Sequence, residues 1–276
     1  MRVIDVRHLG NERVIGCWEI DGVLVDPGPE SSLETLLEGL EGERPRAVLL
    51  THIHFDHAGA SGALVRRWPD LPVYVHARGA RHLADPERLV SSATRLYGED
   101  GMRELWGEVV PVPQENLHVL EGGETVLGDF RVEYTPGHAS HHVCYLHEPT
   151  GTAAVGDVAG VRIPPAELVI APTPPPDIDV DAWERAIDLV EDWRPQRLAL
   201  THFGEVTDVE RHLGDLRRTL RAQAGAARAA DLETFTARHR ERLVEEAGEE
   251  TAAIYMQAAP PDHLWLGLDR WWSKQA

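Results

Sequence analysis

One short stretch of this chain concentrates side chains that can bind metal ions. The segment THIHFDH, residues 51–57, places three histidines and one aspartate within six positions, directly after the apolar run AVLL. Imidazole nitrogens and carboxylate oxygens without thiolates are ligands for zinc, iron, manganese or cobalt. The alternative is a solvated loop in a chain that has 15 histidines. Because so dense a pattern seldom arises by chance, we interpret the stretch as a metal-binding strand end.

The expected geometry of this stretch is an extended segment followed by a turn. Alternate side chains of an extended segment share one face, so His52, His54 and Asp56 should point to one side. His57 breaks this alternation, and the small residues after it permit a turn that carries His57 to the opposite flank. Ligands on two flanks suit two metal ions better than one, so the sequence predicts a dinuclear site.

Four shorter motifs elsewhere in the chain contain further candidate ligands. They are VDPG at 25–28, TPGH at 135–138, GD at 156–157 and TH at 201–202. The aspartate of the third motif follows the apolar strand TAAVG, and a carboxylate buried there needs a cation to offset its desolvation.

Taken together, the HxHxDH motif and these four motifs, in this order, resemble the metallo-β-lactamase superfamily and, within it, the glyoxalase II-like hydrolases. The resemblance implies an α/β fold, the αββα sandwich, with a dinuclear metal site at one edge of its sheets. It implies supporting roles for Asp26 and His142. The implied ligands are His52, His54 and His138 for the first metal ion, Asp56, His57 and His202 for the second, and Asp157 as the bridge.

The chemistry implied by this resemblance is hydrolysis by a hydroxide that bridges two divalent ions, with Asp56 and Asp157 as catalytic residues. Zinc is the expected metal, with iron or manganese as alternatives, and the expected substrate is a small molecule with an ester, thioester or lactone bond. A phosphoesterase is one alternative. Another is an iron-dependent redox member, such as a persulfide dioxygenase or a di-iron oxygen-reducing protein. The chain contains a single lysine, which argues against a basic glutathione-binding site of the kind that the resemblance to glyoxalase II would imply.

The elements that must position these residues are short strands alternating with amphipathic helices. Ser32 is the expected cap of a helix over SSLETLLEGL, and the strand RAVLL then leads into the motif. A weak repeat relates RPRAVLLTH, residues 44–52, to RPQRLALTH, residues 194–202, and an amphipathic helix precedes each copy. We interpret the repeat as a duplicated fold whose two halves each bring a histidine to a strand end.

The predicted domain organisation is one metallohydrolase domain over residues 1–210, with a helical extension over 211–276 packed on it. A mostly helical insertion over about 79–110 is a candidate lid. Its residues Tyr97, Met102 and Trp106 are predicted to line an apolar substrate pocket, or else only to pack the insertion onto the core. The final tryptophan-rich helix is expected to dock on its own chain or to contribute to a homodimer.

Composition and charge restrict the class of partner. The 276 residues carry a formal net charge of −19, which repels phosphate backbones and anionic lipid surfaces. We therefore expect neither nucleic acid nor a membrane as partner. Cys17 and Cys144 lie far apart without metal-type spacing, and no apolar leader precedes the first strand, so a cytoplasmic location is expected.

Overall fold

Two mixed sheets lie face to face in the computed structural model, which describes residues 1–275. In the first sheet the strands follow chain order: β1 (Arg2–Asp5), β2 (Gly16–Ile20), β3 (Val23–Val25), β4 (Ala47–Leu49), β5 (Val73–His76) and β6 (Leu117–Leu120). In the second sheet the order is β12 (Gly204–Val206), β11 (Arg197–Leu200), β10 (Thr152–Ala154), β9 (Val143–His147), β8 (Phe130–Tyr134) and β7 (Thr125–Val126). Strands β3 to β6 pair in parallel, as do β10 and β11, and the remaining pairs are antiparallel.

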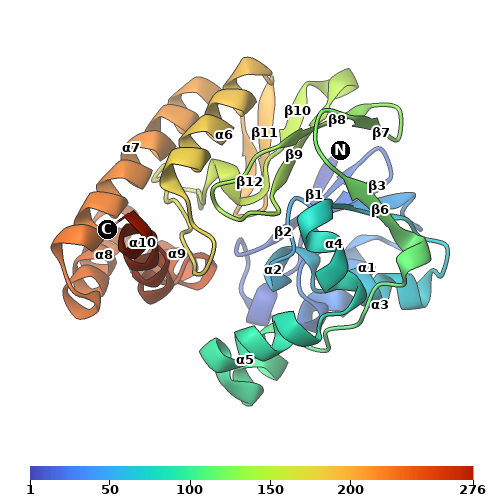
Figure 1. The fold of residues 1–276 in the computed structure, drawn as a ribbon. Helices are drawn as coiled ribbons and strands as arrows, with labels where there is room; N and C mark the ends of the chain where they lie inside the picture. Colours follow the sequence, from blue (N-terminus) through green and yellow to red (C-terminus); the bar gives the residue numbers. More distant parts are fainter. Residues whose placement is uncertain (276) are drawn as a thin grey trace.

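Helices cover the outer face of each sheet, which gives the αββα sandwich (Figure 1). The N-terminal half contains α1 (Leu33–Gly39), α2 (Phe55–Ala58), α3 (Ser61–Arg67), α4 (Ala77–Ala84) and α5 (Glu87–Gly101). The C-terminal half contains α6 (Val180–Asp192), α7 (Val209–Ala229), α8 (Leu232–Ala247), α9 (Glu249–Ala258) and α10 (Pro261–Gln275). Helices α1, α3 and α4 pack on the first sheet, whereas α6 and α7 pack on the second.

The core follows from strand alternation. In β4, Ala47 and Leu49 face the second sheet, while Val48 faces the helices on the opposite side. In β11, Ala199 faces the first sheet, while Leu198 and Leu200 face α6 and α7. Successive strand residues point to opposite faces, so a strand buried on both faces needs an uninterrupted apolar run. Both copies of the sequence repeat supply such a run.

Two local features of the N-terminal half follow from single residues. Asp21 and Gly22 have φ angles of 50° and 72° and join β2 to β3 as a tight hairpin. The predicted cap on α1 is wrong, because the Ser32 side chain makes no capping hydrogen bond. A short 3₁₀ turn over Glu30–Ser32 precedes the helix instead and gives Ser32 a non-extended backbone.

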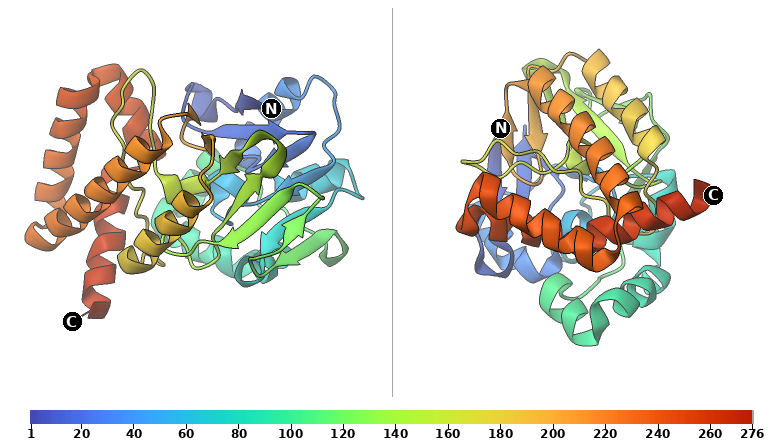
Figure 2. Two further views of the ribbon diagram at one scale, coloured as in Figure 1. Left: turned by 90° about the horizontal axis from the view of Figure 1, so that it is seen from above. Right: turned by 90° about the vertical axis from the view of Figure 1, so that its left-hand side faces the viewer.

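Helices α8, α9 and α10 lie beyond α6 and α7 and share the apolar core of the second sheet (Figure 2). The boundary predicted after residue 210 lies inside α7, so the helical extension does not begin at a break in structure. In α10, the indole Nε1 of Trp265 donates to Ala230 O at 3.0 Å and that of Trp272 donates to Ala224 O at 2.7 Å. The tryptophan-rich face therefore docks on its own chain, and the homodimer stays a prediction.

No helix within residues 1–275 combines the length and the apolar character that crossing a membrane requires.

Candidate metal centre

The histidine-rich motif begins two residues after β4 and runs into helix α2. His52 and His54 lie in the irregular segment after the strand, but Asp56 and His57 lie in the first turn of α2, which begins at Phe55. The prediction of an extended segment through Asp56 is therefore wrong. The helix start explains why two adjacent side chains diverge, since neighbours on a helix are rotated by about 100°.

A first group of three imidazoles meets at the edge of the sandwich. His52 Nε2 lies 3.0 Å from His54 Nδ1, and His138 Nε2 lies 3.1 Å from the same His54 nitrogen. His52 and His138 are fully buried. Three ring nitrogens from two separate loops thus converge on one point, which is a set of ligand atoms that could hold a metal ion.

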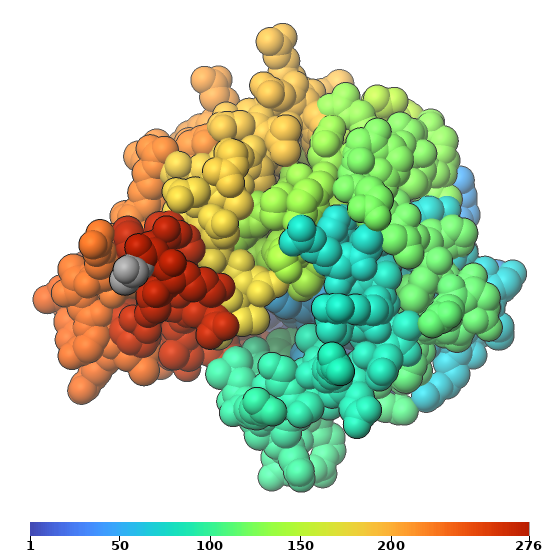
Figure 3. Space-filling view, viewed as in Figure 1, coloured from blue at the N-terminus to red at the C-terminus, as the bar shows by residue number. Residues whose placement is uncertain are grey.

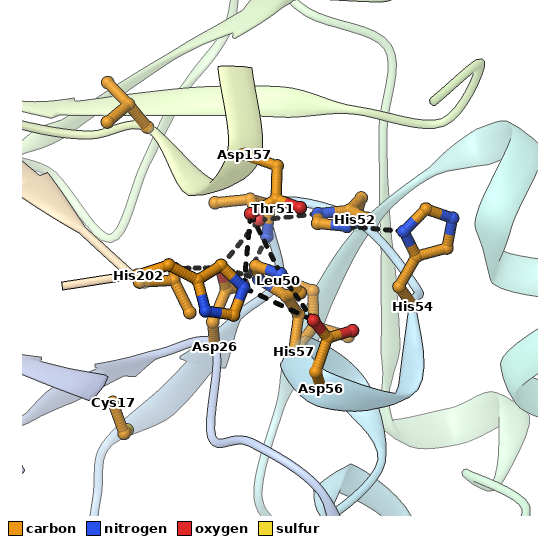
Figure 4. Close-up of polar contacts among 12 residues, drawn as sticks. Cys17, Asp26, Leu50, Thr51, His52, His54, Asp56, His57, Asp157 and His202 are labelled. Carbon is orange, nitrogen blue, oxygen red and sulfur yellow. Dashed lines mark hydrogen bonds and ion pairs between the residues drawn. The ribbon is translucent and has the colours of Figure 1, made fainter. Parts of the chain in front are cut away.

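A second group lies beside the first, with Asp157 between them (Figure 4). Asp56 Oδ2 lies 3.5 Å from His57 Nε2 and 3.3 Å from His202 Nε2. One oxygen of Asp157, Oδ1, lies 3.3 Å from His57 Nε2, and the other, Oδ2, lies 3.3 Å from His138 Nε2. The Asp157 carboxylate therefore faces both groups, as a bridging ligand must.

Hydrogen bonds on the outer side of the rings fix which nitrogen faces the centre. His57 Nδ1 donates to Asp26 Oδ2 at 2.8 Å, His138 Nδ1 to Pro172 O at 2.9 Å and His202 Nδ1 to Val14 O at 2.6 Å. His52 Nδ1 donates to Thr51 Oγ1 at 3.1 Å. Because each acceptor holds the proton on Nδ1, each Nε2 lone pair is free to bind a cation.

Asp26 organises the segments behind the site. Its carboxylate accepts from Thr51 N at 2.8 Å, from Thr51 Oγ1 at 2.6 Å and from Thr201 Oγ1 at 3.1 Å, in addition to His57. Thr51 and Thr201 occupy matching positions in the two copies of the repeat. The supporting role expected for Asp26 thus takes the form of one buried carboxylate that ties both halves together.

The electrostatics of the two groups differ. Burial lowers the pKa of His54 to about 4 and holds the pKa of His52 well below its ordinary value, so these rings are neutral at pH 7. Burial opposes protonation of His57 too, but Asp157, Asp56 and Asp26 outweigh it and raise its pKa well above the ordinary value. Burial would raise the pKa of Asp157, yet His57, His138 and His202 hold it well below its usual range. The second group is therefore an anionic cavity that favours a cation.

Unpaired buried atoms test whether these residues fit a metal ion. His57 Nε2, His202 Nε2 and Asp157 Oδ1 are buried without a hydrogen-bond partner among residues 1–275, and all three face the centre. Buried polar atoms without partners cost free energy, and a bound cation would satisfy these three together. The residues therefore fit a bound metal cation.

His142 contributes to this site from one side. Its ring stacks on His52 with centroids 5.0 Å apart, and its Nδ1 shares a hydrogen bond of 3.0 Å with Thr135 Oγ1. This packing limits the rotation of His52, which agrees with the supporting position expected for His142.

Residues 19–202 match the family model of the metallo-beta-lactamase superfamily. The chain belongs to this superfamily. It is 35% identical over 139 residues to the probable metallo-hydrolase YqgX of Bacillus subtilis, covering 49% of this chain and 60% of YqgX. It is 31% identical over 127 residues to a hydroxyacylglutathione hydrolase of Enterobacter, covering 46% of this chain and 39% of that enzyme. The chain thus spans less than two thirds of the length of either relative.

Two solved structures extend the comparison. The archaeal superfamily protein ST1585 of Sulfolobus tokodaii aligns over 97% of both chains with a TM-score of 0.70 at 21% identity, which establishes the fold. The protein TTHA1623, solved in a di-iron-bound form, aligns over 74% of this chain and 93% of its own with a TM-score of 0.56 at 27% identity. The family model ends at residue 202 and so does not cover α10.

The predicted pocket residues of this superfamily member lie in α5 and in the π-helical turn Met102–Trp106. Tyr97 and Trp106 pack edge to face, with ring centroids 5.5 Å apart, and Trp106 also lies 6.1 Å from Phe55, next to Asp56 in the chain. Met102 is buried and contributes to packing. The insertion therefore contacts Phe55, the neighbour of Asp56, through Trp106, and a pocket-lining role for Tyr97, Met102 and Trp106 stays a prediction.

Sequence reasoning missed several residues at this site. The sequence assigns no role to His8 or His263, yet His8 stacks on Trp106 at 5.5 Å and His263 lies 5.5 Å from Tyr97. No motif marks either residue. Thr51 and Thr201, which donate to Asp26, could have been found, because both belong to the repeated LTH segment.

Proposed function

We propose that this chain is a metal-dependent hydrolase that cleaves an ester, thioester or lactone bond of a small molecule with two divalent ions bound. The observation that carries the proposal is the common orientation of four imidazoles, whose Nδ1 atoms are held by outer acceptors while Nε2 points inward. The printed names of relatives support it, because YqgX is a probable metallo-hydrolase and hydroxyacylglutathione hydrolases act on a thioester.

The proposed ligands are those implied by the sequence: His52, His54 and His138 for one ion, Asp56, His57 and His202 for the other, and Asp157 between them. When bound, such ions supply hydroxide at neutral pH and polarise the substrate carbonyl. Asp56 is the most exposed of the two carboxylates, with 21% of its side chain accessible against 5% for Asp157. An ionised carboxylate at this opening can orient a water molecule by accepting its hydrogen bond, whereas Asp157 is enclosed and holds the two groups together.

Zinc is the proposed ion, because all seven ligands are nitrogen or oxygen donors in a superfamily of metallo-hydrolases. A second candidate is an iron-dependent redox activity, favoured by the likeness to TTHA1623 in its di-iron-bound form. Metal analysis separates the two. A chain that carries iron and consumes oxygen, without cleaving esters, would replace the hydrolase proposal.

The direct test is a panel of ester, thioester, lactone and phosphoester substrates assayed with measured metal content. Hydrolysis should require two metals per chain and should disappear with a chelator. Asp157→Ala should lose metal and reduce kcat/KM by about 100-fold or more, because outer partners of ligands already cost 10 to 100-fold. Asp70→Ala is the matched control, since Asp70 is exposed and pairs only with Arg44. Full metal content and full rate in Asp157→Ala would remove Asp157 from the site.

A further inference from the structure

Four aromatic rings from four separate segments meet beside the metal centre. His8 comes from the 3₁₀ turn His8–Gly10, Tyr97 from α5, Trp106 from the turn after α5 and His263 from α10. The His8 and Trp106 rings are stacked with an interplanar angle of 7°, and Tyr97 stands nearly perpendicular to both Trp106 and His263. We call these four residues the aromatic wall.

The wall lies on the open side of the metal centre. Among the ligands of the second group, Asp56 is 21% exposed, whereas the side chains of His57 and His202 are 0% and 2% exposed. Phe55 precedes Asp56 and packs against Trp106 at 6.1 Å, so the wall adjoins the exposed ligand. Figure 3 shows a hollow on this face between α5 and α10, the two helices that contribute Tyr97 and His263. A substrate that reaches Asp56 from this hollow must pass the wall.

Polar side-chain atoms of the aromatic wall lack hydrogen-bond partners. His8 is only 3% exposed, yet its Nδ1 has no hydrogen-bond partner within residues 1–275, and neither has the buried Nε1 of Trp106. No hydrogen bond to the Tyr97 hydroxyl is found in the same part of the chain. Polar atoms left unpaired in a packed cluster cost free energy, and the Trp106 N–H is a buried donor that no acceptor of the cluster satisfies.

Two carboxylates, Asp56 and Asp262, lie close enough to the wall to act on its titratable residues. The groups that act on Tyr97 are Asp56 and Asp262, which together with burial raise its pKa, so its hydroxyl stays protonated and can donate. Asp262 also acts on His263, and Asp56 acts on His8. No arginine or lysine is among the groups that shift the pKa of these three residues. An anionic ligand group would therefore be repelled here, whereas a neutral acceptor would be bound.

We propose that the aromatic wall binds a neutral aromatic group of the substrate that carries a hydrogen-bond acceptor, and that Tyr97 and Trp106 determine this specificity. This rests on the proposed hydrolase function and narrows its substrate class to aryl esters or thioesters. Aromatic rings pack edge to face or offset on such a surface, and the unpaired donors then meet the acceptor.

The kinetic test uses acetate esters that differ in one group: phenyl, 4-acetylphenyl, 4-carboxyphenyl and cyclohexyl. Wild-type to variant ratios of kcat/KM cancel the intrinsic reactivity of each ester. Trp106→Leu should reduce kcat/KM about tenfold for the two neutral aryl esters, phenyl and 4-acetylphenyl acetate, relative to cyclohexyl acetate, whereas 4-carboxyphenyl acetate should already be poor in the wild type. Tyr97→Phe keeps the ring and should lose about tenfold for 4-acetylphenyl acetate but less than twofold for phenyl acetate.

Metal content is measured for every variant and should match the wild type. An equal loss on all four esters would show that the wall acts only through folding and would overturn the proposal. So would a wild type that prefers the 4-carboxyphenyl ester.

A second measurement does not depend on hydrolysis. The indole N–H signal of Trp106, assigned in a ¹H–¹⁵N spectrum of the metal-loaded protein by its absence in Trp106→Phe, should shift on addition of acetophenone. Cyclohexyl methyl ketone, which has the same acceptor without the ring, should shift it much less. If the protein cleaves no ester but this difference is found, the hydrolase function fails and the binding site stands. If the Trp106 signal does not shift with acetophenone, or shifts equally with both ketones, the proposed binding site is wrong, whatever the enzyme hydrolyses.

Discussion

The two sheets supply their metal-binding side chains in different ways. The first sheet supplies four, all within residues 52–57 after β4. The second sheet supplies three, and each comes from a separate loop: His138 after β8, Asp157 after β10 and His202 after β11. The first set is close in sequence before folding, whereas the second set depends on the packing of the whole C-terminal half.

The support behind each set differs accordingly. Gly137, before His138, has φ 142°, and a Cβ there would lie 2.3 Å from Trp183 Cα of α6. Gly156, before Asp157, has φ 46°, and a Cβ there would lie 2.4 Å from Thr51 Oγ1. Only glycine combines these angles with such close contact. Two of the three isolated ligands, His138 and Asp157, therefore follow a glycine against which a neighbouring segment packs closely.

Substitution of Asp26 should weaken the support of both sets of metal-binding side chains. Asp26→Ala would leave Thr51 N, Thr51 Oγ1, Thr201 Oγ1 and His57 Nδ1 without their buried acceptor. We expect a loss of about 3–5 kcal/mol in the free energy of unfolding, as when one partner of a buried charged pair is removed. Urea unfolding at fixed metal concentration measures it, with Asp26→Asn as the milder variant because one acceptor oxygen remains. A loss below about 1 kcal/mol would mean that the two halves are held together by packing alone.

The contiguous motif was easier to predict from the sequence than the ligands that come from separate loops. The contiguous motif predicted the ligand types and a dinuclear site, because close spacing limits geometry, whereas the position at the edge of the sandwich came from the resemblance to the superfamily. The resemblance to the superfamily was needed to place His138 and Asp157, since neither has a local signal beyond a short turn or strand end. His8 and His263 could not be predicted, because their contacts join an N-terminal turn to an insertion and α10 to α5, far apart in the sequence.

The pH dependence of stability tests whether His212 supports the second set of metal-binding side chains. His212 of α7 donates from Nε2 to Ala159 O at 2.8 Å, two residues after Asp157, and its buried Nδ1 has no partner in the described chain. Burial lowers the pKa of His212 to about 4. Below its unfolded pKa of about 6.5 the unfolded chain takes up a proton that the folded chain refuses, so stability falls as the pH falls from about 6.5 to about 4, by up to about 3 kcal/mol.

His212→Gln keeps a donor for Ala159 O and removes the titration. Its free energy of unfolding should therefore fall less steeply than that of the wild type over this pH range. The exposed His118, substituted by Gln, should leave the wild-type slope unchanged. Identical slopes for wild type and His212→Gln would show that His212 does not contribute to the acid sensitivity of this half.

The segment that orients His138 offers a smaller effect with a close control. Residues 171–173 are held by Gln223 of α7, which bonds both N and O of Ala171, and by Thr173 Oγ1, which donates to Leu264 O of α10 at 2.9 Å. Gly267 lies against this segment, and a Cβ there would lie 2.0 Å from Thr173 O. Gly267→Ala should cost about 1–3 kcal/mol of stability through overpacking.

Because Pro172 O accepts the proton of His138 Nδ1, a displaced segment should also weaken metal binding, by about 10-fold. Gly225→Ala in α7 is the control, since nothing lies within 4 Å of the added Cβ, and it should stabilise the helix by about 0.5–1 kcal/mol. Metal titration and thermal unfolding of both variants give the answer. Unchanged metal affinity in a destabilised Gly267→Ala would mean that α10 supports the fold but not the ligand.

The two threonines of the repeat provide the finest comparison, because they occupy matching positions and donate to the same Asp26 oxygen. Thr51 Oγ1 lies 2.6 Å from Asp26 Oδ2 and also accepts from His52 Nδ1, whereas Thr201 Oγ1 lies 3.1 Å away and has no second partner in the described chain. Valine keeps the shape of threonine without the hydroxyl. Thr51→Val should therefore cost about 1–3 kcal/mol and Thr201→Val about 0.5–1.5 kcal/mol in unfolding free energy.

The decisive readout for this pair is metal affinity. Thr51→Val removes the acceptor that fixes the His52 tautomer, so we expect about 10-fold weaker binding of the metal held by His52, with little change in Thr201→Val. Titration of zinc into metal-free protein in competition with a chromophoric chelator measures the zinc affinity of both variants. Equal losses in the two variants would mean that both copies of the repeat act only through Asp26. A larger loss of metal affinity in Thr201→Val than in Thr51→Val would instead mean that the ligands of the second sheet, each in a separate loop, depend more on their threonine.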